Sequence, residues 1–178
     1  IWALADDGDG GLWIGGYLTG LLRMASDGTI QSYHREMAGN ADRCDDIILS
    51  LASGADGGLW IGTNSGLCRW HSDTGLVRVD IDDANPRQRV VGIHTGDTLP
   101  WLAASAGVRA PRGMNAPAIP ATLDIEHGLS VEVEPDGWVW LGTRDGVRRW
   151  QPATGATAMH MARPGQAMSL PSPYIAHI

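Results

Sequence analysis

One stretch decides the fold of this chain: Asp56-Gly57-Gly58-Leu59-Trp60-Ile61-Gly62-Thr63-Asn64-Ser65-Gly66-Leu67-Cys68-Arg69. It contains a glycine-rich turn, a short apolar run centred on a tryptophan, a second turn, and an apolar run that ends on arginine. Gly57 and Gly58 suit a tight hairpin, because glycine adopts positive φ at little cost. Leu59, Trp60 and Ile61 are apolar at consecutive positions, so both faces of this strand are expected to be covered.

The same pattern occurs four times along the chain. The four strands are Leu12-Trp13-Ile14-Gly15, Leu59-Trp60-Ile61-Gly62, Pro100-Trp101-Leu102-Ala103 and Val139-Trp140-Leu141-Gly142. Their tryptophans recur about every 40–50 residues, which is the period of a propeller blade, here meaning one four-stranded sheet per unit. We therefore expect these residues to be structural repeat positions: Trp13, Gly15, Trp60, Gly62, Trp101, Trp140 and Gly142.

We predict an all-β chain, a β-propeller of four four-stranded antiparallel blades. The expected blades span residues 1–44, 45–88, 89–127 and 128–173, and 174–178 begins a further one. The third is expected to be the least regular, because Ala103 and Ala104 replace the Gly-Thr of other units and a Pro- and Ala-rich stretch follows from 111 to 120. Since the ends of such a string leave one face uncovered, we expect a fragment of a larger propeller.

Composition restricts the function further. A hydrophobic content of 43% permits a sizeable core, and a net charge of −7 argues against nucleic acid as a partner, because phosphate binding needs a basic face. No apolar run is long enough to span a membrane. Cys44 and Cys68 fit no metal-binding spacing; they make one candidate pair, but buried or unpaired thiols are the favoured interpretation.

The sequence offers little catalytic chemistry. Asp7-Gly8-Asp9-Gly10 resembles the start of a calcium loop, but Leu18 stands where a bidentate acid would be needed, so a hairpin turn is favoured. No two histidines have metal-ligand spacing, and no Gly-x-Ser-x-Gly nucleophile motif occurs. We therefore predict no metal site, no cofactor and no catalytic residue, and hence no enzyme in this segment.

A ligand site is expected where loops gather at one end of the sheets. In a four-stranded meander, the loop entering the first strand and the turn between the second and third strands emerge on the same face, around the mouth of the central channel. Arginine offers a donor fork for carboxylates and tyrosine a stacking platform for sugars. The candidate ligand-binding residues are Tyr17, Arg43, Asp45, Asn64, Arg89, Arg144, Asp145 and Tyr174. Ordinary solvated loop residues are the alternative at each position.

The stretches 56–69 and 136–149 closely resemble two-component regulator propeller repeats. The resemblance covers essentially the whole chain and is weakest in the third unit. It implies a propeller of about seven blades in the periplasmic sensor region of a bacterial membrane receptor, with a histidine kinase or diguanylate cyclase output elsewhere in the protein. It carries over fold and role only, since such repeats offer no catalytic motif.

Three functions stay open at this point. The first is non-enzymatic sensing of a sugar, an oligosaccharide or a small acid, relayed to the remaining blades and downstream signalling domains of the same protein. The second is a scaffold that mediates homodimerisation without a small ligand. The third, and least favoured, is a propeller lyase.

Overall fold

The computed structural model describes residues 1–17, 19–33, 44–81, 85, 87–96, 100–119, 128–163, 170 and 174–175. No helix in these ranges is long and apolar enough to cross a membrane. The strands are β1 (Ala3–Asp6), β2 (Leu12–Gly15), β3 (Leu21–Met24), β4 (Ile30–Tyr33), β5 (Ile48–Ser53), β6 (Leu59–Thr63), β7 (Gly66–His71), β8 (Gly75–Val79), β9 (Val90–Thr95), β10 (Pro100–Ala104), β11 (Gly107–Arg109), β12 (Ser130–Val133), β13 (Val139–Gly142), β14 (Val147–Gln151) and β15 (Ala156–His160).

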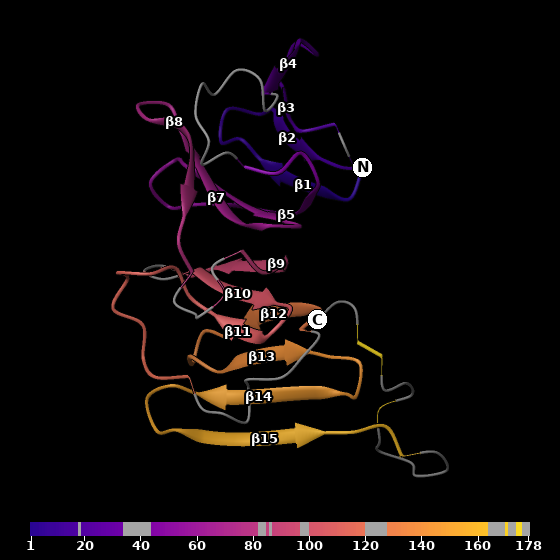
Figure 1. Cartoon of the computed structure of the whole chain (residues 1–178), viewed down its shortest axis with the longest axis vertical. Coiled ribbons are helices and arrows are strands. Elements are labelled where there is room, and N and C mark those ends of the chain that lie inside the picture. The colour runs from indigo at the N-terminus through magenta and orange to yellow at the C-terminus, as the bar shows by residue number, and fades with distance from the viewer. Residues whose placement is uncertain are drawn as a thin grey trace.

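These strands form four antiparallel sheets, each a meander in chain order. The first sheet is β1 to β4, the second β5 to β8, the third β9 to β11 and the fourth β12 to β15. The first strands of successive sheets, β1, β5, β9 and β12, contact one another, so the sheets follow one after another as in a propeller (Figure 1). The predicted β-propeller fold is confirmed.

The third sheet differs from the prediction of four strands per blade, since the described residues give it only three. Its outer edge, β11, is followed by Pro111, which has no N–H to donate to a ladder. Ile81, in the segment that leaves β8, forms a single antiparallel bridge with Pro111 there, and the Arg112 N–H donates to the Asp80 carbonyl over 2.7 Å. The chain leaving the second sheet therefore covers the edge where a fourth strand would pair.

The repeat tryptophans occupy equivalent positions, as predicted. Trp13 packs in a buried cluster with Leu59 and Ile61 of the next sheet. Trp60 packs with Val90 and Leu102 of the sheet after it. Trp101 packs against residues of the fourth sheet, including Trp150, whose ring meets it edge-on at 5.5 Å between centroids. Each of these three indoles thus stabilises the contact between its own sheet and the one that follows.

A second repeated contact uses the glycine that ends the tryptophan strand, and we call it the glycine contact. The residue that meets this glycine lies at the start of the next sheet for the first two glycines, and in the C-terminal segment for the third. A Cβ built on Gly15 would stand 2.3 Å from Ile48 Cγ2, one on Gly62 would stand 2.9 Å from Val90 Cγ1, and one on Gly142 would stand 3.2 Å from Ile175 Cγ2. A side chain at these glycines would therefore separate the sheets.

Between the third and fourth sheets, the glycine and the larger residue have changed places. Ala103 pairs with Gly92 as Gly62 pairs with Ser50, so alanine takes the place of the usual glycine. In the second and third sheets, Ile48 and Val90 each lie two residues before the residue that pairs with the end of the tryptophan strand. In the fourth sheet, Gly128 lies two residues before Ser130, which pairs with Gly142. A Cβ on Gly128 would stand 2.8 Å from the Ala104 carbonyl oxygen. The larger residue is thus on the earlier sheet and the glycine on the later one.

Cys44 and Cys68 form a disulfide, which corrects the expectation of unpaired thiols. They lie 24 residues apart, but their Cα atoms are 6.0 Å apart. Cys68 is on β7, and Cys44 is in the segment that enters β5. This proximity is produced by the pairing of β5, β6 and β7, which spacing along the chain does not reveal.

Candidate functional site

The predicted ligand-binding residues that the structure describes lie along one rim, which we call the entry rim. It consists of the turns that join the second and third strands of each sheet, together with the segments that enter the first strands. Backbone hydrogen bonds connect the two sets: Ile48 N–H donates to Gly16 O over 3.1 Å, Ser105 N–H donates to Arg89 O over 2.9 Å, and Ile175 N–H donates to Thr143 O over 2.9 Å. The prediction that these loops share one face is therefore correct.

Threonine hydroxyls fix two of the entry-rim turns. The Thr63 hydroxyl donates to Gly66 O over 2.9 Å and accepts from the Ser65 N–H over 3.1 Å. Thr143 does the same with Gly146 O and Asp145 N–H, at 2.8 and 3.1 Å. Ala104 at the corresponding position has no hydroxyl. There the buried Gln88 supports the turn, because its Oε1 accepts from the Ala106 N–H over 3.0 Å.

Most of the candidates on this rim are open to solvent. Tyr17 is 57% exposed and forms an aromatic pair with Trp2, the ring centroids 5.5 Å apart. The other exposed candidates are Asn64, Arg89, Arg144, Asp145 and Tyr174. Asp45 is half-buried, and its Oδ1 accepts from the Ile47 N–H over 3.1 Å, so it shapes the segment entering β5. Arg43 lies outside the described residues.

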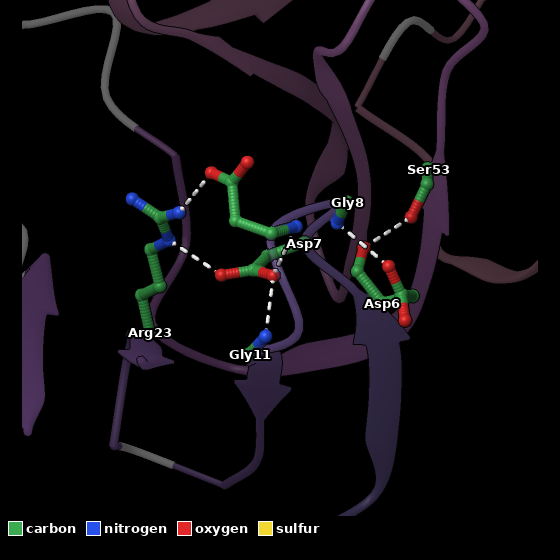
Figure 2. Close-up of polar contacts among 7 residues, drawn as sticks. Asp6, Asp7, Gly8, Gly11, Arg23 and Ser53 are labelled. Atoms are coloured by element: carbon green, nitrogen blue, oxygen red, sulfur yellow. Dashed lines mark hydrogen bonds and ion pairs between the residues drawn. The ribbon is translucent and has the colours of Figure 1, made fainter. Parts of the chain in front are cut away.

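The opposite rim carries the turns between first and second strands, and in the first sheet its carboxylates are already neutralised. Asp7 Oδ1 accepts from the N–H groups of Asp9 and Gly11, while Asp7 Oδ2 accepts from Arg23 Nε over 2.9 Å (Figure 2). A second Arg23 nitrogen donates to Asp9 Oδ2 over 2.9 Å. The guanidinium therefore bridges the Asp7 and Asp9 carboxylates, and the turn is a hairpin, as predicted.

These contacts alter the pKa of Asp7, whose side chain is only 1% exposed. Burial acts to raise the pKa, but the N–H groups of Asp9 and Gly11 and the Arg23 guanidinium together lower it below its usual 3.8. Asp56 in the second sheet has the same arrangement, since it accepts from the Gly58 N–H and pairs with Arg69. Its pKa is also lowered: burial opposes the change, and the Gly58 N–H and Arg69 outweigh it.

One feature that the predicted site missed is a cleft on this second rim, between the third and fourth sheets. Its volume is about 1040 Å³, and its lining includes His94, Trp101, Asn115 and Glu134. A signal for it exists in the sequence. His94 and Glu132 stand on their first strands opposite Trp101 and Trp140, whereas Ala5 and Ala52 stand opposite Trp13 and Trp60.

Comparison with known proteins supports the fold. No protein-family profile and no curated protein matches this chain. Solved structures do. The extracellular domain of the putative one component system BT4673 from B. thetaiotaomicron matches with a TM-score of 0.78 at 19% identity, over 98% of this chain and 24% of that one. The extracellular domain of the putative hybrid two component system BT3049 from the same organism matches with a TM-score of 0.54 at 14% identity, over 93% of this chain and 29% of that one.

An enzyme is also among the similar structures. Virginiamycin B lyase from Staphylococcus aureus matches with a TM-score of 0.69 at 15% identity, over 94% of this chain and 57% of that one. This chain spans about a quarter of the length of the two sensor domains it resembles. At these identities the likeness shows the fold alone: the chain has the fold of consecutive β-propeller sheets, which it shares with the extracellular domains of these sensor systems.

Proposed function

We propose that this chain is part of a non-enzymatic, ligand-sensing propeller in the extracytoplasmic region of a bacterial membrane receptor. The observation that carries the proposal is the entry rim, where solvent-exposed tyrosine, arginine and carboxylate side chains stand on turns fixed by backbone and threonine hydrogen bonds. Its expected ligand is a sugar, an oligosaccharide or a small acid. Output by a kinase or a cyclase would come from other parts of the protein.

Two further observations support a periplasmic location. The structures with extracellular sensor domains match nearly the whole of this chain. The disulfide between Cys44 and Cys68 is of a type that persists in oxidising compartments and is rare in the cytosol.

A thermal-shift screen of the intact receptor's sensor region against sugars, oligosaccharides and small acids tests this function. We expect at least one compound to raise the unfolding temperature, and Tyr17→Ala with Arg144→Ala to abolish that rise. The control is Asp73→Ala, because Asp73 is exposed in the turn between β7 and β8, on the opposite rim. Stabilisation that survives the entry-rim variants would place the ligand elsewhere, and no stabilisation by any compound would contradict sensing of these classes.

A scaffold function has its own observation, the uncovered apolar face of the first sheet. Ile1 is 83% exposed and Leu4 is 56% exposed. Ile1 lies two residues before Ala3, the partner of Gly15, so it corresponds to Ile48, which is buried against the preceding sheet. This favours coverage by another blade of the same protein or by a second copy. Light scattering across concentration separates the two, because only a homodimer would double the mass.

The lyase alternative rests on the similarity to virginiamycin B lyase. That enzyme was also solved, as a catalytically inactive variant, with quinupristin, which supplies a direct assay. We expect no consumption of quinupristin by this protein, with or without added divalent metal. Turnover above the rate of a heat-inactivated sample would reverse the assignment as a non-enzyme.

A further inference from the structure

The cleft on the second rim borders Trp101, and the third sheet lacks a side chain that the other sheets possess opposite their repeat tryptophan. In those sheets an arginine stands directly opposite the repeat tryptophan, in the register pairs Trp13–Arg23, Trp60–Arg69 and Trp140–Arg149. Their guanidinium carbons lie 5.6, 4.2 and 5.4 Å from the indole centroids. Three tryptophans of this fold are thus already covered by an internal cation.

Ala110 occupies the corresponding position in the third sheet. The pairing of Leu102 with Arg109 places Ala110 opposite Trp101, and Ala110 belongs to the same buried cluster as that indole. Among the described residues the third sheet has no strand outside β11, and the segment that contains Met114 and Asn115 borders the cleft. Ala110 itself is 1% exposed and does not line the cleft, which borders Trp101, His94 and Gly96.

The cleft is bordered by a carboxylate, the group with which an arginine side chain would pair. Glu134 is exposed and lines it, and Glu132, which is also exposed, has its Oε1 3.1 Å from Nδ1 of the lining residue His94. The lining residues that the structure describes include no arginine, and the sequence has no lysine. In the first and second sheets, by contrast, the turn carboxylates Asp7 and Asp56 each pair with the arginine above the tryptophan. The cleft thus retains an acidic edge and an indole without the cation.

We propose that this cleft binds a small organic cation with a guanidinium head group, which takes the place of the missing arginine. Glu134 accepts charge-assisted hydrogen bonds from the guanidinium, Asn115 offers a neutral partner, and Trp101, 6% exposed, lines the cleft beside them. An anion is disfavoured here because the glutamates would repel it. The site is distinct from the entry rim and does not depend on the ligand proposed there.

Isothermal titration of the full chain with agmatine, a guanidinium compound, tests the proposal against N-carbamoylputrescine, which replaces the guanidinium by a neutral urea group. We expect agmatine to bind with a Kd between about 1 μM and 1 mM, and the urea analogue to bind at least about tenfold more weakly. Glu134→Gln is expected to weaken agmatine binding about five- to tenfold, and added salt to weaken it further.

Ala110→Arg is the decisive variant, because it restores the internal arginine opposite Trp101 and should abolish agmatine binding. Ala118→Arg is its charge-matched control: Ala118 is exposed and outside the lining, so binding should be largely retained. Asn115→Trp, in the exposed segment after β11, blocks the cleft without entering the core and serves if Ala110→Arg fails to fold. Equal affinity for both compounds, no agmatine binding, or equal loss with Ala118→Arg and Ala110→Arg would overturn the proposal.

These outcomes are independent of the sensing function proposed above. Variants of the entry rim, such as Arg144→Ala, should leave agmatine affinity unchanged. A sugar or acid that binds the entry rim while agmatine fails to bind would refute the cleft site alone. Agmatine binding lost with Arg144→Ala but retained with Glu134→Gln would assign the cation to the entry rim and refute the cleft site as well.

Discussion

The glycine contact between consecutive sheets permits a quantitative test of the architecture. Gly15 has no side chain, and a Cβ built there would lie 2.3 Å from Cγ2 and 2.9 Å from Cβ of Ile48, where ordinary contact begins near 3.4 Å. All the severe overlaps come from this one side chain. Gly15→Ala therefore requires the first and second sheets to move apart by about an ångström, and overpacking of this kind costs about 1–3 kcal/mol.

A double-mutant cycle isolates this steric term. Ile48→Gly removes a buried side chain and adds backbone freedom, so by itself it should destabilise by about 3–5 kcal/mol. With Ile48 truncated, however, Gly15→Ala should cost little, because no side chain opposes the new methyl group. We expect the double variant to be less destabilised than the sum of the single variants by about 1–3 kcal/mol. The chain contains this exchange already, as Ala103 with Gly128.

Chemical denaturation of the four proteins of the cycle, followed by tryptophan fluorescence, gives the required free energies of unfolding. Gly28→Ala serves as a comparison without steric overlap, because Gly28 has a φ of 85° and open space around its Cβ position. Its cost would come from backbone strain alone, and it should show no coupling to Ile48→Gly. Additivity of Gly15→Ala and Ile48→Gly within about 0.5 kcal/mol would refute the idea that glycine is required for sheet packing.

Three further predictions concern the turns and the disulfide. Thr63→Val should lower the free energy of unfolding by about 1–3 kcal/mol in the same denaturation assay, because the Gly66 carbonyl and the Ser65 N–H lose the hydroxyl as a partner. Thr157→Val, on the exposed β15, is the control and should change the free energy of unfolding little. Equal effects of the two variants would exclude the turn explanation. Asp7→Asn should make the free energy of unfolding fall less steeply at acid pH. The folded pKa of Asp7 is below 3.8, so its stabilising contribution is complete above that pH and is lost as the pH falls through the lower folded value. Identical acid midpoints for the two proteins, measured by circular dichroism, would contradict the role of Arg23. Replacing Cys44 and Cys68 by alanine should destabilise the chain by about 3 kcal/mol, given the 24-residue separation, and a reducing agent should lower the stability of the unaltered chain but not of the variant.

Much of the fold could be predicted from the sequence because the repeat is carried by local chemistry. Glycine with positive φ makes the hairpins, as Gly57 does with φ 78°, and the apolar strand between two turns can only be satisfied by covering both faces. Trp13, Trp60 and Trp101 therefore behave alike, and each can be placed from its neighbours in the chain. The position of the entry rim could be predicted from the same meander, because strand order alone determines which turns lie at the same end of a sheet.

What could not be predicted depends on residues brought together from different units. The Cys44–Cys68 bond requires the register of β5, β6 and β7, which the spacing of 24 residues does not contain. In the described part of the third sheet, Ile81 from the preceding unit forms a single bridge with Pro111 at the edge beyond the three strands. In both cases the deciding contact joins segments that no local pattern relates.

The cleft shows why a repeat is most informative where it fails. In the first and second sheets, the turn aspartate pairs with the arginine that lies over the repeat tryptophan. In the third sheet Ala110 stands in place of the arginine, yet Glu134 of the next sheet lines the cleft, and Glu132 pairs with His94 of its lining. A stability-driven drift would be expected to fill or neutralise such a space, whereas this one keeps an acidic edge, an indole and an opening to solvent. That combination favours binding of an external cation over a simple packing defect.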